Sequence, residues 1–289
     1  MTRNIAYTAA IADVTSNGYF EFYDSDMYEN YAYQTPVASI LDSRLTSIIS
    51  NCQIHSNRDL YNTWAIEIND ACDKTCSVPE QLRTYYRNSG ALTYSDIRAE
   101  SLFIIVSSSL KLQQHTIIYN QNTIINMFLS DVELIDSVVE DVDINTTSFR
   151  ITSSTCAFKN LVFNNISQNG DSELLLVNLD SSIIIDFLNF TDSNSSLLIS
   201  RNSIITINRL YAENIKSDKS IIQISESEYT KIDDIQIANA KIINQQPIVL
   251  ISDSIKIEIS NINARNNKGT LISLVSSTFD SIDNAIIQN

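Results

Sequence analysis

Glycine and proline are scarce in this sequence: only four glycines and three prolines occur among its 289 residues. The glycines stand far apart, so the chain has neither a glycine-rich phosphate loop nor the nucleophile elbow of a hydrolase. Isoleucine, asparagine and serine are abundant instead. Because β-branched residues suit strands and small polar residues suit turns, this composition favours an all-β protein over a helical bundle.

Basic residues are also few, with 19 Lys and Arg against 34 Asp and Glu and a net charge of −15. An acidic surface repels phosphate backbones, so we expect no nucleic-acid partner. The longest strong apolar run covers only residues 102–106, far short of the ~20 residues of a membrane span. Residues 1–17 contain no convincing signal core, so a leader gives no information on secretion.

Carboxylates are concentrated in residues 131–143, a stretch without Lys or Arg. These acids are Asp131, Glu133, Asp136, Glu140, Asp141 and Asp143. We interpret them as a solvated face, so no cofactor is expected. The alternative is a Ca²⁺ site, because a hard cation needs several convergent oxygens.

The four cysteines fall into two groups. Cys72 and Cys76 lie in a polar stretch, where we expect a short-loop disulfide if the compartment is oxidising. A zinc site would need more ligands than this pair supplies, and the two histidines of the chain lie far from it in sequence. Cys52 and Cys156 stand among apolar residues, so we expect them in the core.

An apolar triplet with the spacing i, i+3, i+5 recurs through the last two thirds of the chain. Its copies are Val139, Val142, Ile144; Phe158, Leu161, Phe163; Ile185, Leu188, Phe190; Ile207, Leu210, Ala212; Ile232, Ile235, Ile237; Ile259, Ile262, Ala264; and Ile282, Ala285, Ile287. An earlier, weaker copy is Leu112, His115, Ile117. From His115 to Ala285 the steps between middle members average about 24 residues, which is the length of one solenoid coil.

Three further columns repeat with the triplet. An apolar pair with the i, i+2 spacing of a strand precedes most copies: Leu102, Ile104; Leu175, Val177; Leu197, Ile199; Ile222, Ile224; Val249, Ile251; and Ile272, Leu274. A small polar column comes between pair and triplet: Ser107, Ser153, Asp180, Asn202, Ser227, Ser254 and Ser277. Two residues after the triplet stand Asn165, Asp192, Asn214, Asn239, Asn266 and Asn289. Asparagine tolerates the left-handed backbone of a sharp corner and its amide can bridge neighbouring coils, so we predict an asparagine ladder that satisfies buried polar groups.

These columns predict an all-β fold, a right-handed parallel β-helix solenoid with coils of about 24 residues. About eight to ten coils stacked ~4.8 Å apart would give a rod ~40–50 Å long. Leucine-rich repeats have a similar period but need Leu at fixed positions, and a β-sandwich would not keep one ladder for six coils. We assign residues 96–289 to the regular coils, and residues 1–95 to irregular N-terminal coils or a cap with a protruding loop.

The first third is less regular. Residues 36–56 are interpreted as one coil, with Ile49, Cys52 and Ile54 in the triplet columns, and residues 60–95 as one degenerate coil that carries the protruding loop. The aromatic-rich residues 19–33 are interpreted as a terminal coil or cap, and the alternative is an aromatic surface for a glycan or a protein. The candidate partner-binding residues are Tyr28, Tyr31, Tyr33, Trp64, Tyr85 and Tyr86.

On these columns, residues 99–289 resemble the pectin-lyase-like family of right-handed β-helices, which have three short parallel sheets and interior Asn and Ser ladders. The composition and repeat style also resemble the long Ile-, Asn- and Ser-rich surface proteins of protists such as ciliates. The first resemblance implies an alternative function as a carbohydrate-active lyase or hydrolase. Its pectin-degrading members use a Gly-His-Gly or an Arg-centred motif beside their acids, and this sequence has no such tripeptide. Asp233 and Asp234 have no acidic neighbours in their column, so no catalytic residue is assigned.

We expect a non-enzymatic structural or adhesive recognition module of a larger cell-surface or filamentous assembly, located outside the cell, with a protein or glycan partner. An end-on protein partner, or further coils, should cover the last coil, because its strand edges lack any closing segment. Of the four N-x-[ST] sequons, Asn145, Asn189 and Asn194 are candidate glycosylation sites. Asn165 stands in the predicted ladder, so we expect it to stay bare.

Overall fold

The fold was examined in a computed structural model of the chain. The structure describes residues 5–6, 11–15, 18–28, 30–32, 37–43, 45–55, 58–59, 101–114, 116–118, 123–144, 147–168 and 173–288. All elements in these ranges are strands, and all their pairings are parallel. No helix that is long and apolar enough to cross a membrane occurs among them.

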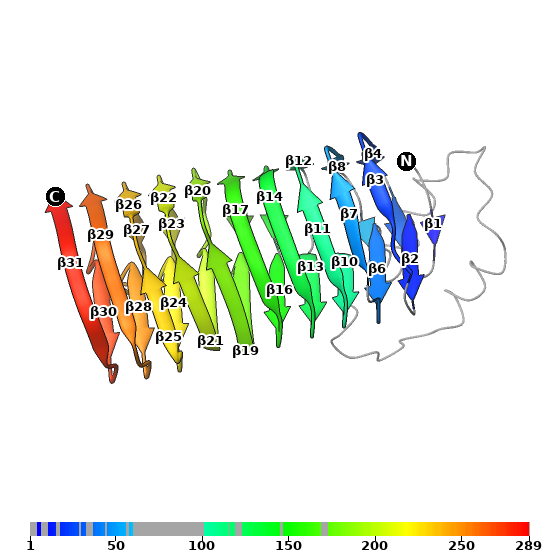
Figure 1. The fold of residues 1–289 in the computed structure, drawn as a ribbon. Helices are drawn as coiled ribbons and strands as arrows, with labels where there is room; N and C mark the ends of the chain where they lie inside the picture. Colours follow the sequence, from blue (N-terminus) through cyan, green and yellow to red (C-terminus); the bar gives the residue numbers. More distant parts are fainter. Residues whose placement is uncertain are drawn as a thin grey trace, which may run out of the picture.

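The chain winds into a parallel β-solenoid with turns of about 25 residues, and its coils stack side by side along one axis (Figure 1). Each coil contributes strands to three faces. The first face consists of β2 (Ala12–Thr15), β6 (Ala38–Leu41), β10 (Ser101–Val106), β13 (Thr123–Phe128), β16 (Phe149–Thr152), the first parts of β19 (Leu175–Ile185) and β21 (Leu198–Ile207), β24 (Ile222–Ser225), β28 (Val249–Ser252) and β30 (Ile272–Val275). These ten rungs, about 4.8 Å apart, span roughly 45 Å.

The second and third faces are built in the same way. The second face consists of β3 (Glu21–Tyr23), β7 (Thr46–Ser50), β11 (Ser109–Gln113), the first parts of β14 (Asp131–Glu140) and β17 (Thr155–Asn164), the second parts of β19 and β21, β25 (Tyr229–Ile232), and the first parts of β29 (Ile257–Arg265) and β31 (Phe279–Gln288). The third face consists of β4 (Asp26–Tyr28), β8 (Gln53–His55), β12 (Thr116–Ile118), the second parts of β14 and β17, β20 (Leu188–Thr191), β22 (Leu210–Glu213), β26 (Ile235–Ala238), and the second parts of β29 and β31.

Short strands complete several coils between the third face and the next first face. They are β1 (Ile5–Ala6), β5 (Tyr31–Ala32), β9 (Arg58–Asp59), β15 (Asp143–Ile144), β18 (Ser167–Gln168), β23 (Lys216–Ser217) and β27 (Lys241–Ile242). They pair with one another in the sets β1–β5–β9, β15–β18 and β23–β27, and isolated bridges join Ser167 of β18 to Asn194 and Lys241 of β27 to Lys268.

Strand β17 shows how the sequence forms a coil. Its side chains alternate between inside and outside, with Cys156 and Phe158 buried on the second face, and Leu161 and Phe163 buried on the third. Between the two halves, Asn160 has a φ of 55°, and this left-handed residue turns the strand from one face to the next. Alternation places the apolar residues inside, and a polar left-handed residue makes the corner.

The predicted apolar columns form the core. Members of the triplets from Phe158 to Ala264 that the structure describes are at most 3% exposed, as are Leu175, Val177, Ile222, Ile224 and Val249 from the pairs. Cys52 and Cys156 are buried, at 2% and 1% exposure, which confirms their assignment to the core. The core prediction is therefore confirmed over most of the chain.

Two parts of the repeat were assigned in the wrong register. Strand pairing aligns Leu134, Ser137 and Val139 with Phe158, Leu161 and Phe163, so the copy written as Val139, Val142, Ile144 is displaced by five residues. Two pairs are displaced by one residue. The inward residues are Phe103 and Ile105 in place of Leu102 and Ile104, and Leu198 and Ser200 in place of Leu197 and Ile199.

The predicted small polar column consists of two adjacent columns. Ser107, Ser153, Asp180 and Asn202 have left-handed backbone at a corner, with φ between 47° and 58°. The next residue of each coil is a serine that points inward. This serine ladder comprises Ser43, Ser108, Ser130, Ser154, Ser181, Ser203, Ser227, Ser254 and Ser277.

The serine ladder links successive coils through buried hydrogen bonds. The backbone N–H of Ser108 donates to Ser130 Oγ at 3.2 Å, and the N–H of Ser130 donates to Ser154 Oγ at 3.1 Å. Each of these hydroxyls donates to the carbonyl two residues earlier in its own coil, as Ser154 does to Thr152 at 2.6 Å. At these corners one hydroxyl therefore satisfies both a buried N–H and a carbonyl.

The asparagine column lies where it was predicted along the sequence, but its side chains face solvent. Asn165, Asn214 and Asn239 have φ between 51° and 57°. Their amides donate to the preceding coil, as Asn214 Nδ2 does to Asp192 Oδ1 at 2.8 Å and Asn239 Nδ2 to Asn214 Oδ1 at 3.1 Å. The prediction of a buried ladder is wrong for asparagine, because these side chains are exposed, and serine fills the buried role.

The first coils stack on the later ones without a rung between them. Ala38 pairs with Phe103, Ile49 with Leu112, and Ile54 with Ile117. This confirms the coil at residues 36–56, whereas the degenerate coil predicted at residues 60–95 lies outside the described residues. The boundary near residue 95 and the protruding loop lie outside the described residues. Strands β2, β3 and β4 form an earlier coil, which agrees with a terminal coil for much of residues 19–33.

Candidate functional site

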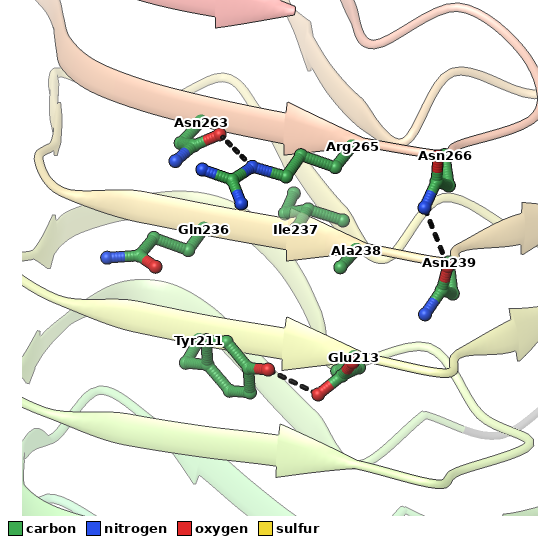
Figure 2. A pocket seen from close by; sticks show the side chains of 9 residues that line it. All are labelled: Tyr211, Glu213, Gln236, Ile237, Ala238, Asn239, Asn263, Arg265 and Asn266. Atoms are coloured by element: carbon green, nitrogen blue, oxygen red, sulfur yellow. Dashed lines mark hydrogen bonds between the residues drawn. The ribbon is translucent and has the colours of Figure 1, made fainter. Parts of the chain in front are cut away.

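A hollow lies on the third face, where β22, β26 and β29 run side by side. Pairing aligns the outward residues Tyr211, Gln236 and Asn263 in one column. A second outward column contains Glu213, Ala238 and Arg265. The hollow has a volume of about 280 Å³, and its lining is shown in Figure 2. Its lining residues are Tyr211, Glu213, Gln236, Ile237, Ala238, Asn239, Asn263, Arg265 and Asn266.

A small side chain creates the depression. Ala238 lies in the column between Glu213 and Arg265, and its methyl group leaves the centre of the site open. The strand of Ala238 lies between those of Glu213 and Arg265, so the backbones of these two residues are two strand spacings, about 10 Å, apart. A carboxylate therefore stands at one end of the hollow and a guanidinium at the other.

The side chains at each end are held by a neighbour on the same strand. The Tyr211 hydroxyl donates to Glu213 Oε2, and this hydrogen bond, followed by partial desolvation and the charge of Glu213, raises the pKa of Tyr211. Arg265 Nε donates to Asn263 Oδ1 at 3.2 Å. Figure 2 shows the Arg265 guanidinium reaching from β29 towards Gln236. Both ends are thus positioned before any ligand arrives.

Two residues of the asparagine ladder form the rim at the corner. Asn266 Nδ2 lies 3.5 Å from Asn239 Oδ1, and Asn239 in turn donates to Asn214. Together with Gln236 and Asn263, they surround the site with side-chain amides, each of which offers donors and an acceptor. The lining contains one carboxylate and no second acid, so it supplies hydrogen bonds for a ligand but no acid and base pair for hydrolysis.

Tyr28 and Tyr31 are the two described residues among those proposed from sequence for partner binding, and neither lines this hollow. Tyr28 is half-buried at the end of β4, and Tyr31 lies in β5, paired with Ile5 and Arg58. Tyr28 shares its column with Glu213 but belongs to the first coil of that column. Outside the described residues lie Tyr33, Trp64, Cys72, Cys76, Tyr85, Tyr86 and Asn145.

The sequence analysis included Asn239 and Asn266 in the corner column but did not predict the hollow, because the outward strand positions beside them were not aligned between coils. The lining residues come from three coils and are separated by 25 and 27 positions, as in Tyr211, Gln236 and Asn263. The signal that was available is the pair of outward columns that stand one and three residues before each predicted corner asparagine. Aligned by coil, these columns bring an aromatic, an acid, a base and amides together.

The two adjacent acids Asp233 and Asp234 do not face a third acid. Asp233 Oδ1 accepts hydrogen bonds from Ser260 Oγ at 2.7 Å and Asn261 Nδ2 at 2.8 Å, and these bonds lower the pKa of Asp233. Asp234 has a φ of 45° and forms a corner. These contacts assign both residues to the link between coils.

The acidic stretch follows strand β14 and its corners, so its side chains spread along the surface. Glu133 lies between Lys111, with Nζ 3.8 Å from Oε2, and Lys159, whose Nζ hydrogen-bonds Oε1 and lowers the pKa of Glu133. Asp136 and Asp141 each accept an amide hydrogen bond from the next coil. Over the described ranges, no group of three or more His, Cys, Asp and Glu residues gathers in a way that could hold a metal ion.

The sequon residues occupy different positions on the surface. Asn165 is exposed at a corner, where its amide donates to Asp141 at 2.6 Å. Asn189 faces outward but is half-buried on the third face, next to Tyr211. Asn194 is exposed in a short bridge to Ser167. Asn165 and Asn194 are therefore more accessible than Asn189.

No model of a known protein family matches the chain, and no curated protein matches it in sequence. The class that the described residues define is that of a parallel β-solenoid.

Proposed function

We propose that this chain is a non-enzymatic recognition module, a stiff solenoid that presents a binding site on its third face within a larger extracellular assembly. The observation that carries this proposal is the composition of the hollow: one carboxylate, one guanidinium, one phenol and four amides, with no second acid. Such a lining suits orientation of a polar ligand. Bond cleavage by paired carboxylates would need another acid.

The rod itself supports a structural role. Backbone ladders on three faces and the serine ladder join each coil to the next, so the described coils share one continuous hydrogen-bonded framework. A stiff scaffold keeps a surface site in fixed geometry. Adhesion between larger bodies is a function that needs this property.

An end-on partner at the last coil remains part of the proposal. Leu271, Ile272 and Leu274 are only partly buried, whereas Val249 and Ile251 in the preceding coil are at most 3% exposed. A further coil of parallel strands, from this chain or another subunit, would bury them.

The alternative is a carbohydrate-active lyase or hydrolase of the pectin-lyase-like kind. What supports it is the repeat architecture and the serine ladder, and what it lacks is a pair of facing carboxylates in the hollow. The protein should be incubated with a panel of neutral and acidic polysaccharides, with detection of new reducing ends and of unsaturated products. Binding without product supports the recognition module. Turnover that Glu213→Gln abolishes would overturn it.

A further inference from the structure

We infer that the hollow on the third face binds a neutral sugar residue of an extended glycan. This inference rests on the proposed recognition function and specifies its ligand. It starts from the charges of the site. Glu213 and Arg265 stand at opposite ends of the hollow, so the formal charge of the lining is zero.

Electrostatics then disfavour charged ligands. The chain carries a net charge of −15, and this field repels a polyanion such as a polyuronate. A cationic ligand would be attracted by the chain as a whole but meets the Arg265 guanidinium at the site. A ligand rich in hydroxyl groups and without charge satisfies both constraints.

The size of the hollow fits one or two small rings. Its volume of about 280 Å³ is slightly below the roughly 300–1,000 Å³ typical of pockets for drug-sized molecules. Vicinal hydroxyls of a sugar can pair with the amides of Gln236 and Asn263 and with guanidinium N–H groups of Arg265, which offer donors and acceptors at fixed positions. The Tyr211 ring, held by Glu213, supplies an aromatic surface for the apolar side of the sugar.

An extended peptide strand fits the site less well. Peptides commonly add to an open sheet edge, where their backbone gains hydrogen bonds. Strand β26 is already paired on both sides, with β22 and β29, so the hollow offers no free edge. Recognition at this face must therefore proceed through side chains.

The glycan should run along the rod axis. The column that contains Tyr211, Gln236 and Asn263 continues to Asn189 in the preceding coil, so polar groups repeat at each rung. This column of the third face therefore offers hydrogen-bonding side chains to a glycan in four successive rungs.

The test uses the full chain and hexasaccharides of defined composition: cellohexaose, xylohexaose and mannohexaose as neutral probes, and hexagalacturonate as the acidic probe. Affinities are measured by isothermal titration calorimetry at low and high salt. We expect at least one neutral probe to bind with an affinity that salt does not change, and hexagalacturonate to bind more weakly or not at all.

Ala238→Arg fills the centre of the hollow and provides the critical variant. Ala157→Arg is the matched control, because Ala157 is also an outward alanine in a strand, on the second face, and the charge change is the same. We expect Ala238→Arg to weaken binding about tenfold or more, and Ala157→Arg to leave it within about twofold. Thermal unfolding followed by circular dichroism verifies that both variants fold. If Ala238→Arg does not fold, Tyr211→Ala provides a second variant, which removes side-chain atoms from the hollow and adds none.

Several results would overturn the inference. Absence of binding by every neutral probe, preference for hexagalacturonate, or equal losses in Ala238→Arg and Ala157→Arg would each exclude a neutral-sugar site in the hollow. These outcomes leave a non-enzymatic module with a different partner intact. Cleavage of a probe, detected in the same samples by mass spectrometry, would instead contradict the proposed function.

Discussion

Removal of one hydroxyl from the serine ladder, by Ser154→Ala, tests how the coils are joined. Ser154 Oγ accepts the backbone N–H of Ser130 at 3.1 Å and donates to the carbonyl of Thr152 at 2.6 Å. Ser130 and Ser154 are 5% and 6% exposed, so water has little access to the groups that lose their partner. The carbonyl of Thr152 keeps a second donor, the N–H of Leu129, at 3.3 Å.

The expected cost therefore comes mainly from one buried N–H without an acceptor. Such a group costs about 1–3 kcal/mol, and we expect Ser154→Ala to lower the free energy of unfolding by that amount. The control is Thr155→Val, which removes a hydroxyl from the adjacent, exposed position and preserves the branched side chain. We expect its effect to stay within about 0.5 kcal/mol.

Urea denaturation followed by far-ultraviolet circular dichroism measures both variants against the wild type. A lower midpoint for Ser154→Ala with an unchanged slope would support a loss of native stability. If the two variants unfold at the same urea concentration, the serine hydroxyls do not stabilise the stacking of coils, and the account of the ladder fails.

Four further predictions concern the core, a corner, the thiols and pH. Phe158 packs in a buried aromatic cluster, so Phe158→Ala should cost about 3–5 kcal/mol in the same urea assay, and a smaller loss would argue against a close-packed core. Asn214 has a φ of 57°, so Asn214→Ala should destabilise more than Asn214→Gly, by about 1 kcal/mol; the reverse order in thermal melts would contradict a left-handed corner. Burial raises the pKa of both Cys52 and Cys156, so with the other two cysteines replaced by serine the native protein should not react with a disulfide reagent until it is denatured. The hydrogen bonds that lower the pKa of Asp233 stabilise the fold above the unfolded pKa of about 3.9, and this stability is lost as pH falls through the lower folded pKa. Asp233→Asn should therefore reduce the change of the urea midpoint with pH in this acid range. An unchanged pH dependence would refute this role of Asp233.

Much of the fold was predictable because its determinants are local in sequence. Alternation of period two identifies inward residues, and a left-handed asparagine such as Asn165 marks where a strand turns. When these signals recur once per coil, the class of fold follows without any long-range information. The apolar columns of the later coils were predicted for this reason.

The register of the repeat was predicted wrongly where an inward position is polar. Ser137 occupies the middle position of its triplet, so the triplet was wrongly assigned to Val139 and Val142, which are apolar. The wrong assignment also agreed with the corner spacing, because Asp136 and Asp141 are both left-handed and lie five residues apart. Ser200 is likewise fully buried at a position expected to be apolar. An interior serine such as Ser137, whose hydroxyl donates to the Ile135 carbonyl at 2.8 Å, cannot be distinguished from a surface serine in one sequence.

The candidate site was the least predictable feature. The many aromatic residues of the first third led to a predicted binding surface there. Tyr211 and Arg265 belong to different coils and line the same hollow only because the coils stack. The depth of the hollow depends on Ala238, a residue that is inconspicuous in sequence. Its effect arises from the larger neighbours that pairing places on either side.

The direct stacking of Ala38 on Phe103 has a consequence for the order in which the coils form. Other neighbouring rungs of this face are joined by segments of about 25 residues, but here the residue numbers differ by 65. Loop closure costs about 0.6 kcal/mol for each doubling of length, so this junction is about 0.8 kcal/mol harder to close than the others. Nucleation among the coils beyond residue 101 is therefore favoured, and the first two coils dock onto a surface that already exists. The segments synthesised first would then be the last to acquire native structure.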